Sequence, residues 1–271
     1  MTFNNIINRS VFSSVGTLLK NEDIDAFLRY FEYNMEFLSK FPHIIYSFNG
    51  EKSLVDILES IVKNKLPNSS VKFLFAENLG HTFGSLLSEV VIFEATKELT
   101  DVDFVWKFSN DVIITTKFLD IEVPVVDFYY INNIGYNVFS TCTTIEELVN
   151  KIHSREYFYP QTNYYIIKNK INFIPDKNGI YTMFKQYDLR QNKELKPWDV
   201  ITKCECEHFL KLTVERNNLS SHMLLNDVEL NSIINIIIRY KMWDGSHKNV
   251  AYDRLGGLCH FQWPNTDVMI I

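Results

Sequence analysis

Three polar stretches interrupt apolar runs of the chain and could carry chemistry. They accompany or follow runs typical of buried strands, at 43–48 (HIIYSF), 71–75 (VKFLF) and 104–108 (FVWKF). The polar stretches are Ser47-Phe48-Asn49-Gly50, Glu77 to Gly84 (ENLGHTFG) and Ser109-Asn110-Asp111. Ligands of open α/β sheets bind in the loops at the carboxyl ends of the strands, so we expect these stretches to contribute to one site.

Asp111 is the most informative residue in these stretches. A carboxylate at the end of a core strand is costly unless it meets water, a partner or a metal. Oxygen ligands of this kind suit Mg²⁺ or Mn²⁺, which can bridge a diphosphate and offset its charge as that group leaves. The alternative is that Asp111 only caps a turn.

Gly80 and Gly84 follow a predicted strand and open a predicted helix. Backbone N–H groups at such a position could face a phosphate or a ribose. The pair does not match the dinucleotide fingerprint or the phosphate-binding P-loop, which argues against NAD or ATP chemistry. Both glycines could instead serve a tight turn and close packing.

The elements that would position these residues alternate along the chain. Apolar residues at helical spacing predict helices from Asn21 to near Pro42, around 54–62 and around 86–91, with the three strands between and after them. Strands separated by helices indicate an α/β fold with a mostly parallel sheet. Residues 1–20 show no firm pattern. We expect one continuous domain with an N-terminal helical segment (1–40) and two halves that follow it, 41–120 and 121–271.

Composition excludes several classes of protein. The 271 residues carry 27 Lys and Arg against 33 Asp and Glu, a net charge of −6, which disfavours a free-standing nucleic-acid binder. No secretion signal and no apolar run of bilayer length is visible, so we expect a soluble, cytoplasmic protein with no integral membrane segment. The thiols of its four cysteines should then be reduced.

The order of these segments resembles the nucleotide-binding half of nucleotide-sugar-dependent glycosyltransferases of the GT-A fold (family-2-like). The resemblance covers roughly residues 40–115 and rests on HIIYSFNG, VKFLFAEN, LGHTFG and DFVWKFSNDVII. In that group a strand ends in an Asp-any-Asp motif whose last carboxylate holds the metal. Here Ser109 stands where the first Asp is usual, which leaves Asp111 as the ligand. Asn78-Leu79-Gly80 with Gly84 resembles the group's Asn-any-Gly turn.

The resemblance continues at scattered points of the C-terminal half. Members often carry an acid at the start of a helix near the acceptor, which implies Glu207 as the catalytic base, with Glu205 as the second choice. Both acids could instead complement a helix dipole. A late His that completes the metal site would be His247, beside Lys248 as a counter-charge, with His260 as the alternative.

The resemblance implies a GT-A-like, Rossmann-related, mostly parallel sheet flanked by helices. It makes 41–120 the nucleotide-sugar-binding half and 121–271 a mixed α+β acceptor-side half. The implied reaction is metal-assisted transfer of a sugar from a nucleotide-diphosphate donor, first of all a UDP-sugar, with inversion. The acceptor would be a hydroxyl of a glycan, a lipid-linked sugar, a protein or modified DNA. Mn²⁺ or Mg²⁺ is the expected cofactor. The residues expected to bind the nucleotide-sugar are Ser47, Asn49, Asn78, Gly80, Ser109, Asn110 and Lys248.

Two other interpretations stay open. The fold could be right without catalysis, which would leave a sugar-nucleotide-binding or structural protein, and Ser109 in place of an acid keeps that possibility alive. A zinc-stapled interaction domain is the other possibility. Its ligands would be drawn from Cys204, Cys206, His208, Cys259 and His260. The Cys-any-Cys spacing is a poor match to the usual zinc knuckle.

Overall fold

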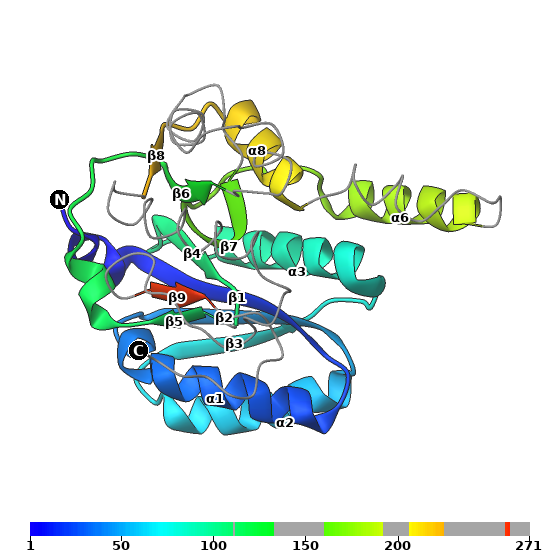
Figure 1. Ribbon diagram of the computed structural model, residues 1–271, viewed down its shortest axis with the longest axis horizontal. Coiled ribbons are helices and arrows are strands. Elements are labelled where there is room, and N and C mark those ends of the chain that lie inside the picture. Colours follow the sequence, from blue (N-terminus) through cyan, green and yellow to red (C-terminus); the bar gives the residue numbers. More distant parts are fainter. Residues whose placement is uncertain (111, 133–159, 192–205, 225–257, 261–271) are drawn as a thin grey trace, which may run out of the picture.

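A seven-stranded sheet forms the centre of the molecule. The computed structural model describes residues 1–110, 112–132, 160–191, 206–224 and 258–260. Within these residues the strands lie in the order β3-β2-β1-β4-β7-β6-β8, with helices on both faces (Figure 1). They are β1 (Ser10–Leu18), β2 (His43–Gly50), β3 (Ser70–Phe75), β4 (Phe104–Phe108), β6 (Phe128–Asn132), β7 (Pro160–Lys168) and β8 (Ser221–Met223).

The sheet is mostly parallel, and the predicted fold class is confirmed. β3, β2, β1 and β4 run parallel to one another, and β6 runs parallel to β8. β7 is the exception, because it is antiparallel to both of its neighbours, β4 and β6. The carboxyl ends of the first four strands therefore lie at one edge of the sheet, and the amino end of β7 comes to that same edge.

Helices cover the two faces of the sheet (Figure 1). α1 and α2 pack on one face, and α3, α6 and α8 on the other. Their bounds are α1 (Asn21–Leu38), α2 (Lys52–Lys65), α3 (Gly80–Lys97), α6 (Lys177–Gln191) and α8 (Cys206–Arg216), with short 3₁₀ helices η1 (Phe3–Asn5), η2 (Ile7–Arg9) and η3 (Thr116–Asp120). The first three α-helices agree with the helices predicted from apolar periodicity.

β1 is the central strand of the parallel half, although residues 1–20 showed no firm pattern. It lies within 1–40, where we expected a helical segment, and it pairs with both β2 and β4. Central parallel strands are usually rich in Val and Ile, whereas β1 buries serines. The Ser13 hydroxyl donates to the Trp106 carbonyl oxygen (3.1 Å), and Ser10 Oγ accepts from Trp106 Nε1 (3.1 Å). At Ser10 and Ser13, hydrogen bonds to Trp106 thus take the place of apolar packing.

A small two-stranded sheet lies beside the main one. β5 (Val112–Ile114) and β9 (Leu258–His260) are antiparallel, and Val112 is paired with His260. The free edge of β5 is held by the buried side chain of Asn34 on α1. Its Nδ2 donates to the Val112 carbonyl oxygen and its Oδ1 accepts from the Ile114 N–H, both at 2.7 Å. Asn34 therefore acts as a surrogate strand that fixes β5 against α1.

No helix in the described part of the chain combines the length and the apolar character that a membrane crossing needs.

Candidate active site

The β4–β5 turn is the first part of the candidate site at the carboxyl edge. The Val112 N–H donates to the Ser109 carbonyl oxygen (3.1 Å), which closes a tight turn directly after β4. The Asn110 side chain lies against β1, where a Cβ on Gly16 would come within 2.6 Å of Asn110 Nδ2. Gly16 thus makes room for Asn110. Asp111 lies outside the described residues, so its role stays a prediction.

The β5–β9 ladder brings a late histidine to this turn. Main-chain pairing places His260 opposite Val112, the residue that follows Asp111 in the sequence. His247 and Lys248 lie outside the described residues. A carboxylate and an imidazole are a donor set that Mn²⁺ accepts, so the residue types of Asp111 and His260 suit the expected ion. Within the described part of the chain, no group of three His, Cys, Asp or Glu residues could hold a metal.

Asn49 and Ser47 lie between β2 and α3, enclosed from solvent. Asn49 is 1% exposed, and a Cβ on Gly84, the fifth residue of α3, would stand 3.1 Å from Asn49 Cγ and Nδ2. Among the described residues, no hydrogen-bond partner is found for Asn49 Nδ2, Asn49 Oδ1 or the Ser47 hydroxyl. Buried polar atoms without partners cost free energy, so these two residues are not explained by packing.

Asn78 and Gly80 form the turn that opens α3. The exposed Asn78 side chain accepts a hydrogen bond from the Gly80 N–H through its Oδ1 (3.1 Å). Gly80 has a φ of +79°, and a Cβ there would meet nothing within 4 Å. The glycine is therefore required by backbone conformation rather than by a close neighbour. This geometry agrees with the tight-turn interpretation and leaves the predicted nucleotide contact as a prediction.

Glu207, on α8, contacts β7 at the same edge of the sheet. It stands in the first turn of α8, half-buried, and its Oε1 accepts a hydrogen bond from the Thr162 hydroxyl (3.2 Å). Thr162 lies near the amino end of β7, which is antiparallel to β4. The acid that we predicted as the base is thus at the sheet edge that carries the β4–β5 turn. Glu205 lies outside the described residues.

A buried ion pair that the sequence analysis did not identify lies under Glu207. Lys107 on β4 and Glu89 on α3 are 3% and 2% exposed, and Lys107 Nζ is 3.2 Å from Glu89 Oε1. Lys107 Nζ also donates to the main-chain carbonyl of Thr162, and the Tyr165 hydroxyl donates to Glu89 Oε1 (3.4 Å). Burial raises the pKa of the Glu89 carboxyl, the charge of Lys107 opposes that rise, and Glu207 adds to it. A lysine inside the apolar run FVWKF was the available sequence signal.

The described zinc candidates do not favour a zinc site. Burial raises the pKa of the Cys206 thiol far above its usual range, whereas zinc binds the thiolate. His208, its neighbour on α8, is exposed, and its ring packs edge-on against Phe209. Cys259 and His260 belong to β9, in the other sheet, and Cys204 lies outside the described residues.

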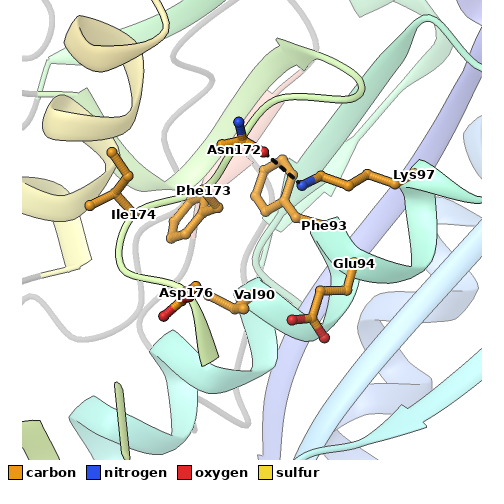
Figure 2. Close-up of a pocket in the computed structure, with 8 residues that line it drawn as sticks. All are labelled: Val90, Phe93, Glu94, Lys97, Asn172, Phe173, Ile174 and Asp176. Atoms are coloured by element: carbon orange, nitrogen blue, oxygen red, sulfur yellow. Dashed lines mark hydrogen bonds between the residues drawn. The ribbon is translucent and has the colours of Figure 1, made fainter. Parts of the chain in front are cut away.

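Two cavities in the described part of the molecule lie away from the carboxyl edge. The first, of about 350 Å³, is bounded by the second half of α3 and the segment that follows β7 (Figure 2). Its floor is the stacked pair Phe93 and Phe173, with centroids 4.8 Å apart, and Lys97 reaches across to Asn172 (3.2 Å). The second, of about 630 Å³, lies at the amino end of β4, beside Asp127 and Lys168. Neither contains a predicted site residue.

Comparison with known proteins gave matches among solved structures only. No family model matches the chain, and no curated protein matches it. The chain is similar to the galactosyltransferase LgtC in complex with donor and acceptor sugar analogs (9% identity, TM-score 0.41, 94% of this chain and 87% of that chain). An active-site mutant of LgtC gives 10% identity, a TM-score of 0.46 and coverage of 94% and 88%. A glycosyltransferase involved in the glycosylation of the major capsid of PBCV-1 gives 11% identity and a TM-score of 0.34, with 79% of this chain and 80% of that chain covered. These structural neighbours are glycosyltransferases.

Proposed function

We propose that this chain is a glycosyltransferase that moves a sugar from a nucleotide-diphosphate donor to a hydroxyl acceptor with inversion. A UDP-sugar is the first donor to test. One observation carries the proposal: the β5–β9 ladder sets His260 opposite Val112, next in sequence to Asp111, at the edge where Thr162 holds Glu207. A metal-binding pair and a base would then face each other across one edge of the sheet.

The donor would lie over the carboxyl ends of β1, β2 and β4. Both side-chain amide atoms of Asn49 are buried and without partners in the described structure, and the start of α3 covers them. A ligand that displaces the start of α3 would therefore be able to bind Asn49. The diphosphate would face the N–H groups of the first turn of α3 and the β4–β5 turn, which contains Ser109 and Asn110.

Asp111 and His260 would hold Mn²⁺ or Mg²⁺, with His247 as the other candidate histidine. When bound, the ion would offset the charge that develops on the departing diphosphate.

Glu207 would act as the base. Its carboxylate takes the proton from the acceptor hydroxyl, whose oxygen forms a bond to the anomeric carbon of the sugar. The bond from that carbon to the diphosphate breaks on the opposite face, and its electron pair leaves with the diphosphate oxygen. The hydrogen bond from Thr162 fixes one oxygen of Glu207 and so orients the carboxylate.

The test is turnover with a panel of sugar nucleotides, in the wild type and three variants. Glu207→Gln should lower kcat by about 10²–10⁴, because it removes the base without changing shape. Asp111→Ala should abolish turnover and leave the circular dichroism spectrum unchanged. The control is Glu215→Gln, an exposed acid on the same helix that pairs with Lys211, and it should be fully active. Full activity of Asp111→Ala, or in excess chelator, would remove the metal mechanism, and a normal rate for Glu207→Gln would reassign the base.

A second candidate is a sugar-nucleotide-binding protein without catalysis, which Ser109 in place of an acid favours. The two differ in a thermal-shift screen against nucleoside diphosphates run beside the turnover panel. A metal-dependent rise in melting temperature without any turnover would support the inactive protein.

A further inference from the structure

Among the described residues, hydrogen bonds link the buried pair Lys107–Glu89 to Glu207 through Thr162. Lys107 Nζ donates to the main-chain carbonyl of Thr162, and the hydroxyl of the same residue donates to Glu207 Oε1 (3.2 Å). The main chain of Thr162 is therefore bonded to a buried lysine, and its side chain is bonded to the predicted base.

The pair is anchored to three elements of the fold. Lys107 is on β4, Glu89 is on α3, and Tyr165, on β7, donates its hydroxyl to Glu89 Oε1 (3.4 Å) while its ring lies 5.9 Å from Lys107 Nζ. Main-chain pairing sets Lys107 directly opposite Tyr165. The cluster thus ties the strand that leads into the β4–β5 turn to the strand that carries Thr162.

Stability alone does not explain this cluster. Taking two charges out of water is expensive, and apolar residues of similar volume are often at least as stable in such a place. Glu89 Oε2 moreover has no hydrogen-bond partner in the described structure. A costly buried pair at the back of a site is more easily understood if it fixes the geometry of that site.

We propose that Lys107 and Glu89 are positioning residues that hold Thr162, and through it the carboxylate of Glu207, in the orientation needed for proton abstraction. The proposal rests on the proposed function. Both side chains of the pair are buried beneath Thr162 and Glu207, so the pair should act on kcat and leave the KM for the donor nearly unchanged.

The test is a set of kinetic cycles on the full chain. Lys107→Met should lower kcat by about tenfold to a hundredfold, the usual range for residues that orient a functional group from behind. Thr162→Val, which removes only the hydroxyl, should lower it similarly, and Thr162→Ser, which restores a hydroxyl, should recover most of the rate. In the Glu207→Gln background, Lys107→Met should have little further effect, because both changes remove the same contribution.

Two further measurements separate positioning from loss of fold. Thr213→Val removes another buried hydroxyl from α8, one that bonds Ile174, and serves as the control for destabilisation with kcat unchanged. The second measurement is the KM for the donor, which should stay near the wild-type value in Lys107→Met while kcat falls.

The outcomes distinguish failure of the positioning role from failure of the proposed glycosyltransferase activity. A wild type that turns over no sugar nucleotide overturns both. An active wild type in which Glu207→Gln is impaired, but Lys107→Met keeps its kcat, overturns the positioning role alone. Equal losses from Lys107→Met in the wild-type and Glu207→Gln backgrounds would also overturn it, because the residue would then act independently of the base.

Discussion

The two faces of the central sheet differ in what the same strands present to them. Phe12, Phe48 and Trp106 point toward α1 and α2, where rings stack and cross at centroid distances such as 5.1 Å between Phe41 and Trp106. Their neighbours one residue along the same strands are Ser13, Asn49 and Lys107, which belong to the opposite side, under α3. Aromatic and polar side chains thus alternate in the carboxyl halves of β2 and β4.

The two faces of the sheet therefore contribute differently to stability and to the candidate site. The α1–α2 face buries large apolar rings and should supply most of the free energy of folding. The α3 face buries a charged pair and polar atoms without partners, which reduces stability. Local costs of this kind are expected where a protein binds or transforms a ligand. The polar residues also lie in the carboxyl halves of β2 and β4, close to the candidate site.

The largest effect should come from the centre of the aromatic face. Trp106 is fully buried against Phe3, Phe41 and Phe118, so Trp106→Ala should lower the free energy of unfolding by about 3–5 kcal/mol. Urea denaturation followed by circular dichroism measures this loss. The control is Phe75→Ala, because Phe75 is 39% exposed and should lose much less. A loss below about 1 kcal/mol for Trp106→Ala would contradict the assignment of the main core to this face.

The apolar periodicity of the chain was sufficient to predict α1, α2 and α3 and the strands β2, β3 and β4, because each buries a regular apolar pattern. β1 was missed, since buried serines hydrogen-bonded to Trp106 do not look like a central strand. Two contacts of the site join residues far apart in the chain: Thr162 with Glu207, and Val112 with His260. No local spacing encodes such pairings, which is why the sequence left His247 and His260 as alternatives.

A smaller effect, opposite in sign, is expected on the polar face. Asn49→Leu replaces two buried polar atoms that lack partners, so it should raise the free energy of unfolding by about 0.5–2 kcal/mol. The same change should abolish the thermal shift produced by a nucleoside diphosphate, because the proposed ligand contact is lost. Differential scanning fluorimetry with and without UDP measures both quantities. A destabilised variant that still responds to UDP would make Asn49 an ordinary structural residue.

The smallest effect is a pH dependence confined to the polar face. Burial raises the pKa of Glu89 in the folded protein. Between the unfolded pKa and the folded pKa, the folded protein therefore binds more protons than the unfolded chain. Stability contributed at this position is therefore present below the unfolded pKa and is lost as the pH rises toward the folded pKa. Urea titrations between pH 4 and 6 should show the wild type losing stability relative to Glu89→Gln as the pH rises. A constant difference would mean that Glu89 is ionised in the fold throughout.

The most direct test of the whole account is a titration of Mn²⁺ by isothermal calorimetry in the presence of UDP. The variants to compare are His260→Ala and His247→Ala. If the β5–β9 ladder assembles the metal site, His260→Ala should weaken Mn²⁺ binding by at least about tenfold, while His247→Ala should bind like the wild type. Wild-type affinity in the His260→Ala variant would contradict the placement of the ion between Asp111 and β9.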